Sequence, residues 1–156
     1  MKLHNIVLVV GILTSSSAHA QNLGPIQALV TAGGKCSHLE LAGQKVPCSY
    51  AKGVIYTLLS NGRVLFTIGL SKDKILAFVG SKDSQPSAGN YFLYLSRVDI
   101  TTKAMKSFVD VGGECHLSLS RSGKIWYALT CNAQDADGAA YLLDYKFTDK
   151  PVHSYH

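Results

Sequence analysis

Short apolar stretches separated by turn-forming residues run along most of the chain, and they predict a protein built from β-strands. The clearest pair is 54–59 and 64–68, two runs rich in β-branched and aromatic residues on either side of Asn61-Gly62. Asn-Gly between such runs is a strong hairpin signal, because a type I′ turn needs positive φ at both central residues. Both runs are almost continuously apolar, which predicts strands covered on both faces or strands that line the apolar interior of a barrel.

Further strand signals follow along the chain at a spacing typical of antiparallel sandwiches and barrels. The strongest of them lie at residues 75–80, 91–100 and 139–147. Residues 103–109 fit either a strand or a short helical turn, and Ser, Pro and Gly make 81–90 the longest predicted loop. Only residues 25–29 favour a helix, since a proline is tolerated in a first helical turn. We therefore predict one all-β domain, a small antiparallel barrel or barrel-like sandwich of about eight or nine strands.

The first 20 residues have the pattern of a secretory signal peptide. Lys2 precedes an apolar core at 6–13 that is too short to span a bilayer, and Ala-His-Ala at 18–20 is a small-x-small cleavage signal. We expect cleavage after this signal, an all-β domain over 21–150 and a flexible tail over 151–156. Such a leader predicts a periplasmic or extracellular, oxidising location. We find no second apolar segment long enough to cross a membrane and expect no membrane span in the mature chain.

Four cysteines follow the leader, and their spacing predicts two disulfides, each within a hairpin. The segment 36–48 has a cysteine at both ends and Gly43 beside its midpoint, and the segment 115–131 has Gly123 at its midpoint. Directly opposed strand positions match the Cα separation that a disulfide needs, and glycine supplies positive φ in the turn. Four cysteines allow three pairings. We predict the bonds Cys36–Cys48 and Cys115–Cys131, each contributing about 3 kcal/mol in the chain-entropy model.

Two metal sites compete with these interpretations, and neither is favoured. A zinc site would combine Cys36, His38, Cys115 and His116, but it lacks the tight C-x2-C pair typical of zinc sites. The segment 135–138, Asp-Ala-Asp-Gly, begins like a calcium loop, yet Lys146 occupies the position of the closing acidic ligand. An aspartate-rich hairpin turn accounts for the same residues. We predict no metal and no cofactor.

Catalytic patterns are weak. His38 and His116 each lie close to a predicted disulfide cysteine, so a paired-histidine proton shuttle competes with two partly exposed strand residues. No G-x-S-x-G nucleophile motif occurs. Glu40 and Glu114 are isolated in the sequence, without a signal that they approach each other at glycosidase distances. Whether the protein is an enzyme stays uncertain at this level, and we predict that it is not, with no catalytic residue assigned.

Charge excludes one class of partner, and the aromatic residues suggest others. The chain has 15 Lys and Arg against 10 Asp and Glu, a net charge of +5 that becomes +4 when Lys2 is removed with the leader. These cations are spread singly, so no nucleic-acid groove is predicted. Tyr and Trp combine apolar area with a hydrogen-bonding tip, which suits ligand cavities and interfaces, although core filling explains the same residues. The candidate ligand-binding residues are Tyr91, Tyr94, Trp126, Tyr127 and Tyr141.

These features predict a secreted or periplasmic non-catalytic binding protein whose partner is an unknown small molecule, glycan or protein. One alternative is an inhibitor of a hydrolase such as a lysozyme or protease, in which the predicted loop 81–90 enters the target's cleft. Residues 86–91, Pro-Ser-Ala-Gly-Asn-Tyr, resemble the loop before a tyrosine in periplasmic inhibitors of C-type lysozyme, which are also small secreted β-barrels. That resemblance covers these residues alone, and the cysteine layout differs. Another alternative is an envelope assembly component that adds a strand to a partner's edge.

Overall fold

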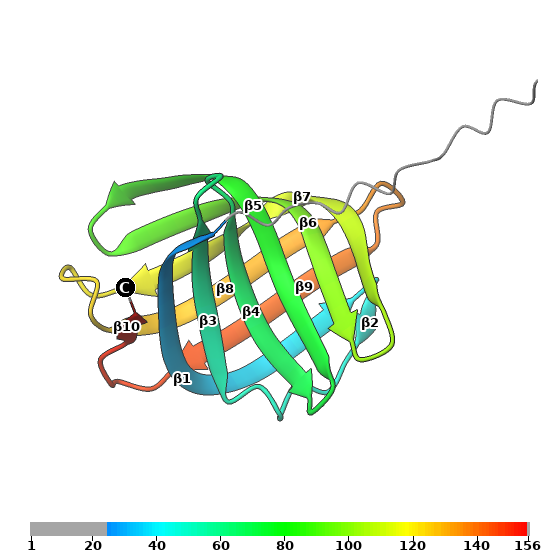
Figure 1. Cartoon of the computed structure of the whole chain (residues 1–156), viewed down its shortest axis with the longest axis horizontal. Coiled ribbons are helices and arrows are strands. Elements are labelled where there is room, and N and C mark those ends of the chain that lie inside the picture. Colours follow the sequence, from blue (N-terminus) through cyan, green and yellow to red (C-terminus); the bar gives the residue numbers. More distant parts are fainter. Residues whose placement is uncertain (1–24, 156) are drawn as a thin grey trace, which may run out of the picture.

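Eight antiparallel strands close into a barrel in the computed structural model, which describes residues 25–155 (Figure 1). This confirms the predicted fold class. The ring strands, each paired with the next in this order, are β1 (Ile26–Leu41), β3 (Gly53–Leu59), β4 (Val64–Ser71), β5 (Lys74–Ser87), β6 (Asn90–Thr102), β7 (Lys106–Leu119), β8 (Trp126–Gln134) and β9 (Ala140–Phe147). Two short strands, β2 (Gln44–Lys45) and β10 (His153–Tyr155), pair with β1 outside the ring. Over the described part of the chain there is no helix, and so none long and apolar enough to cross a membrane. The predicted signal peptide at 1–20 lies outside the described residues.

Strand β1 closes the barrel because its two halves pair with different neighbours. Residues 26–33 pair with β3, and residues 34–40 pair with β9. The helix predicted over 25–29 is wrong, because the β3 ladder takes the backbone groups of this segment and outweighs the weak local preference. Within the predicted tail, residues 153–155 form β10 against Leu29–Thr31 of β1. The flexibility of the tail stays a prediction.

Alternate side chains along the strands fill the interior of the barrel. The largest fully buried ones are Phe66, Phe78, Leu39, Ile68, Leu76, Leu93, Leu129, Leu143, Val54, Val64 and Val98. The sequence predicted that the apolar runs of β3 and β4 are either covered on both faces or line an apolar barrel interior, and the structure shows the latter. Their alternate residues face outward, where Ile55 is exposed and Leu65 is half-buried.

The hairpin predicted between β3 and β4 is confirmed, but its turn is not type I′. Only Gly62 has positive φ (79°), and its N–H donates to the carbonyl oxygen of Leu59 at 2.9 Å. This is the pattern of a type I turn followed by a left-handed glycine. Two consecutive residues with positive φ occur instead between β1 and β2, where Ala42 has φ 53° and Gly43 has φ 73°.

The β5–β6 hairpin projects beyond the ring, as the pair of green strands at the upper left of Figure 1. Gly80 is the last residue of β5 that pairs with β4, so residues 81–87 continue with only β6 beside them. Seven residues of strand extend by about 20 Å. The prediction of a long loop over 81–90 is therefore wrong. Its Ser, Pro and Gly residues are tolerated because this part of β5 is an edge, where Pro86 needs to donate no ladder hydrogen bond to a neighbour on that side.

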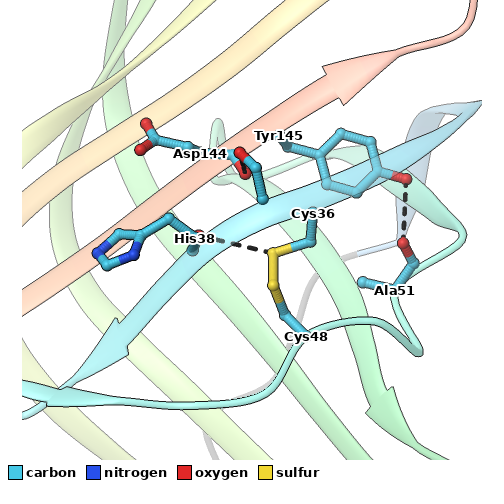
Figure 2. The surroundings of a disulfide bond; sticks show 7 residues. Cys36, His38, Cys48, Ala51, Asp144 and Tyr145 are labelled. Atoms are coloured by element: carbon cyan, nitrogen blue, oxygen red, sulfur yellow. Dashed lines mark hydrogen bonds between the residues drawn. A yellow bond between two sulfur atoms is a disulfide. The ribbon is translucent and has the colours of Figure 1, made fainter.

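Both predicted disulfides are present, and the hairpin geometry fits one of them. Cys115 and Cys131 lie directly opposite each other on β7 and β8, fully buried, with 4.0 Å between their Cα atoms. Cys48 instead lies in the loop after β2 and bonds Cys36 of β1 across a Cα separation of 5.7 Å (Figure 2). The β1–β2 hairpin is too short to carry Cys48 back along β1. Two disulfides in one small domain indicate an oxidising environment.

The Cys36–Cys48 bond lies where the loop between β2 and β3 meets β9 (Figure 2). Tyr145 of β9 is the register partner of Cys36, and its hydroxyl donates to the carbonyl oxygen of Ala51 in this loop at 3.4 Å. The Sγ atom of Cys36 lies 3.5 Å from the carbonyl oxygen of His38. A disulfide sulfur carries no proton, so the latter is a sulfur–oxygen contact and not a hydrogen bond. The disulfide and this buried phenol both hold the loop against the barrel.

We expect the fold to lose stability as the pH rises from 10 toward 12, because burial raises the pKa of Tyr145 from 10.0 to about 12. The Tyr145 hydroxyl therefore ionises at a lower pH in the unfolded chain than in the folded one. The stabilisation of the fold by the neutral phenol is complete below pH 10. It disappears as the pH reaches the folded-state pKa, and the free energy of unfolding falls by about 1.4 kcal/mol per pH unit in this window. Tyr145→Phe should make the decline in the free energy of unfolding shallower, as measured by urea denaturation across this window. Tyr127→Phe, on the exposed surface, is the matched control, and an unchanged slope in Tyr145→Phe would contradict this account.

Candidate functional site: an aromatic pocket at the barrel mouth

One end of the barrel, bordered by residues of the projecting hairpin, opens into a cavity of about 220 Å³, which we call the mouth pocket. Its lining residues are Val30, Tyr56, Gln85, Tyr91, Leu117, Leu119 and Trp126. They come from β1, β3, β5, β6, β7 and β8, so the pocket exists only when the ring is closed. Below it the interior is packed with the buried side chains described above. The mouth pocket is therefore a shallow chamber on top of a filled core.

Strand register brings the aromatic side chains to this end. Tyr56 shares the inward face of β3 with Val54, two residues earlier, and pairs with Phe66 of β4. Trp126 begins β8 and pairs with Leu119, while the next pair joins Ser118 to Ala128. This irregularity leaves Tyr127 without a partner in the ladder, so that Trp126 is buried while Tyr127 is exposed.

The aromatic rings hold one another in edge-to-face arrangements. Tyr56 is central: its ring centroid lies 6.2 Å from that of Tyr91 and 6.3 Å from that of Trp126, with interplanar angles of 79° and 82°. Phe66 lies 5.7 Å from Tyr56 and 6.3 Å from Tyr91. Trp126 also contacts Phe147 at 5.4 Å. Such contacts are favourable beyond simple burial and restrict ring motion, so the walls of the pocket are largely formed before any ligand arrives.

The polar groups of the pocket are the hydroxyls of Tyr56 and Tyr91, the amide of Gln85 and the indole N–H of Trp126, with the carboxylate of Asp83 beside Tyr91. The hydroxyl of Tyr91 donates to Oδ2 of Asp83 at 2.9 Å, and the ring of Tyr56 lies edge-on beside that of Tyr91. Burial is the main cause that raises the pKa of both phenols, and the negative charge of Asp83 adds to it. Both phenols are therefore protonated at neutral pH. Asp83 itself is exposed on the inner side of the projecting hairpin.

The candidate ligand-binding residues named from the sequence divide into three groups. Tyr91 and Trp126 line the mouth pocket. Tyr94 and Tyr127 are on the outer surface, 46 % and 45 % exposed. Tyr141 is buried toward the opposite end, where its hydroxyl donates to Asp135 at 3.4 Å. Whether any of them binds a ligand stays a prediction.

Tyr56, the central ring of the pocket, is missing from that set. The sequence signal that could have found Tyr56 is its position two residues after Val54, on a strand whose inward face is apolar. This pattern places Tyr56 inside the barrel but does not reveal that it lies near an open end.

The histidines and glutamates are not gathered into one cleft. His38 Nε2 lies 3.1 Å from Glu40 Oε1 on β1. His116, on β7, stacks on Phe92 with 4.5 Å between ring centroids and contacts Asn90 Oδ1 at 2.8 Å. The two histidines therefore have separate partners on strands that are not neighbours in the ring, and the paired shuttle is not formed.

No group of three or more His, Cys, Asp or Glu residues within 25–155 is arranged to hold a metal ion. Cys36 and Cys115 of the alternative zinc site are in disulfides. Asp135 Oδ1 accepts the backbone N–H groups of Asp137 and Ala139 at 3.0 and 2.9 Å. With Gly138 at φ 80°, this confirms the hairpin-turn interpretation of that segment.

Comparison of the chain with protein-family models, with curated proteins and with solved structures found no match. Its function has to be inferred from the geometry of its own side chains. The mouth pocket is the feature that combines an apolar cavity with a few convergent polar groups, which is the usual composition of a small-molecule site.

Proposed function

We propose that the protein is a non-catalytic binding protein that holds a small, largely apolar molecule in the mouth pocket. The observation that carries this proposal is the cavity itself: three aromatic and three aliphatic side chains surround about 220 Å³. An engineered apolar cavity of about 150 Å³ takes up benzene, so this volume suits a single-ring molecule or a short aliphatic chain. The packed core beneath the pocket argues against a larger ligand that would fill the whole barrel.

The proposed location is the periplasm or the extracellular space. Two disulfides are stable in such an oxidising environment. The signal-peptide pattern of residues 1–20 supports export, and cleavage after Ala20 would leave the barrel as the mature protein.

The binding proposal can be tested directly because Trp126 is the only tryptophan in the chain and lines the pocket. Titration with toluene should give a saturable change in its emission, with a Kd of about 1 mM for so small a ligand. Leu119→Phe, which adds volume inside the pocket, should abolish this change, whereas Tyr127→Phe on the outer surface should preserve it. Unsaturable emission, or equal binding by Leu119→Phe, would refute the proposal. Mass spectrometry of protein purified from its native compartment would identify a retained ligand.

The projecting β5–β6 hairpin supports a second candidate, a hydrolase inhibitor that inserts this hairpin into a target's cleft. Its tip is held by Asn90 Nδ2, which donates to Ser87 Oγ at 2.8 Å, and by Gln85 Nε2, which donates to the carbonyl oxygen of Ala88 at 3.3 Å. A tip ordered in advance loses little conformational entropy on binding. Inhibition of a C-type lysozyme by the wild-type protein, lost when residues 86–89 are replaced by Asn-Gly, would favour this candidate over the first.

The third candidate, an assembly component that adds a strand to a partner, has less support. In a closed ring both edges of most strands are already paired, and the open edge of β5 at 81–87 contains Lys82 and Pro86. Charged residues and proline on an edge discourage strand addition.

A further inference from the structure

Three aromatic side chains form adjoining walls of the mouth pocket. Tyr56, Tyr91 and Trp126 all line the cavity, and they come from three different strands, β3, β6 and β8. The ring of Tyr56 is nearly perpendicular to those of Tyr91 and Trp126, at 79° and 82°. The cavity is therefore bounded by π systems held at right angles to one another, and not by one flat stack.

Aromatic walls of this kind attract organic cations. The face of a Tyr or Trp ring carries partial negative charge, and a cation within about 6 Å of the ring centroid is stabilised, most strongly where water is excluded. Aromatic cages of this type recognise quaternary ammonium groups. A quaternary ammonium group has no N–H, so it also loses no hydrogen bond against the aliphatic lining residues Val30, Leu117 and Leu119.

A carboxylate lies beside these walls. Oδ2 of Asp83 accepts the hydrogen bond of the Tyr91 hydroxyl at 2.9 Å. Asp83 also precedes Gln85 by two residues on β5, so the two residues share one face of the strand, and Gln85 lines the pocket. A phenol that donates to a carboxylate is polarised by it, which makes the ring more electron-rich. Asp83 therefore favours a cation in the pocket both directly and through Tyr91.

The basic residue next to this carboxylate lies on the other side of the hairpin. Lys82 pairs with Tyr94, which is on the outer surface, whereas Asp83 pairs with Leu93, which is fully buried. The lining residues, all within 25–155, include no Lys, Arg or His. The charge linked to the pocket is thus negative, although the whole chain carries a net charge of +5.

We propose that the mouth pocket selects small organic cations that carry N-methyl groups, with choline as the test ligand. This inference rests on the proposed binding function and adds the class of ligand, since the methyl groups give such a cation a largely apolar surface. A trimethylammonium group is comparable in size to benzene, which an apolar cavity of about 150 Å³ accepts, so it fits within about 220 Å³. It would lie among Tyr56, Tyr91 and Trp126.

Choline and its uncharged isostere neohexyl alcohol test this selection, because the two molecules differ by a carbon atom in place of the nitrogen. Both are titrated against the emission of Trp126, which lines the pocket. Choline should bind about two- to thirtyfold more tightly than neohexyl alcohol, the range that a cation–π contribution provides. Toluene, titrated in parallel, tests the binding function itself.

Two substitutions of Tyr56 separate its ring from its hydroxyl. Tyr56→Leu removes the ring but keeps an apolar side chain, so choline binding should weaken by about two- to tenfold while binding of neohexyl alcohol changes by less than about twofold. Tyr56→Phe keeps the ring and should lose less of the preference for choline than Tyr56→Leu. Tyr127→Phe on the outer surface is the control and should change neither ligand. An undiminished preference for choline in Tyr56→Leu would overturn the inference.

Asp83→Asn tests the charge without removing packed atoms, because Asp83 is exposed. The asparagine side-chain oxygen can still accept from Tyr91, and only the negative charge is lost. Choline binding should weaken by about two- to fivefold and depend less on added salt, while binding of neohexyl alcohol is unchanged. Asp137→Asn is the matched control, because it removes the same charge in the turn after β8, at the other end of this strand from Trp126. Equal choline affinity in Asp83→Asn and Asp137→Asn would contradict the role of Asp83 and overturn the inference.

Free solutes and lipid headgroups both carry trimethylammonium groups, and vesicles of phosphatidylcholine separate these two sources. Co-sedimentation that free choline displaces would identify a headgroup ligand. Choline binding without co-sedimentation would identify a free solute. Either result supports the class of ligand.

The outcomes distinguish this inference from the proposed function. If toluene binding saturates but choline binds no more tightly than neohexyl alcohol, the class of ligand is overturned and the proposed binding function is still supported. If none of the three compounds gives a saturable signal, both are refuted.

Discussion

Replacing Phe66 by alanine is expected to lower the free energy of unfolding by about 3–5 kcal/mol. Phe66 has no exposed surface, pairs in register with Phe78 of β5, and contacts the rings of Tyr56 and Tyr91. The strands around it are held in a closed ring by their ladders, so they cannot collapse into the space left by the ring. The loss is a large share of the roughly 5–15 kcal/mol that stabilises a domain of this kind.

Urea denaturation followed by Trp126 emission measures this loss, with far-ultraviolet circular dichroism as a second probe. Ile75→Ala is the matched control, because Ile75 is also apolar and on a central strand but 45 % exposed. Its loss should stay near 0.5 kcal/mol, as for most surface substitutions. A Phe66→Ala loss below about 1 kcal/mol would mean that the barrel interior is not packed as described.

Removing the Cys115–Cys131 bond by alanine substitution of both residues is the second large effect that we expect. The bond closes a separation of 16 residues, which contributes about 3 kcal/mol in the chain-entropy model. Both sulfur atoms are also buried in the core, and losing them adds about 1–2 kcal/mol. The expected total is therefore about 4–5 kcal/mol.

The other disulfide is the natural comparison. Cys36–Cys48 closes a separation of 12 residues, so its entropic contribution is almost the same, but Cys36 is only partly buried. Cys48 is buried in the core, so the double alanine variant of this bond should lose about 3–4 kcal/mol. Urea denaturation of both variants, with non-reducing peptide mapping to confirm the remaining bond, measures the difference. Equal losses would show that burial of the Cys115–Cys131 sulfurs adds nothing.

Local patterns predicted the strands and the disulfide pairing well. The apolar runs on either side of Asn61-Gly62 carry enough information to define a hairpin, and the glycines between the cysteines mark the turns. The type I′ turn was wrong at Asn61 because loop length and strand twist decide between turn types, and a sequence of turn-forming residues does not specify them. Residues 81–90 were wrongly predicted as a loop because their composition is typical of one. In the structure, the β5 part of this segment pairs with β6, and its other side is an open edge that tolerates proline.

The pocket could be predicted only in part. Tyr91 and Tyr94 are three positions apart on one strand, so their side chains face opposite sides, and the structure places Tyr91 inside and Tyr94 outside. Which inward residues lie at an open end depends on how far each strand extends and on the closure between β1 and β9. Those are non-local properties, and no local periodicity reports them. Tyr56 and Asp83 were therefore not recognised as neighbours of Tyr91.

The divided pairing of β1 makes assembly of the barrel depend on the whole chain. Among the described strands this one is synthesised first, yet its residues 34–40 stay without their partner in the ring until β9 has emerged. Until then the polypeptide is an open, curling sheet with two unmatched borders, and sheets closed by such distant segments form slowly. The two cysteine pairs, separated by only 12 and 16 residues, can be oxidised during that interval. Covalent linkage would then precede ring closure, and the mouth pocket would be the last part of the molecule to take shape.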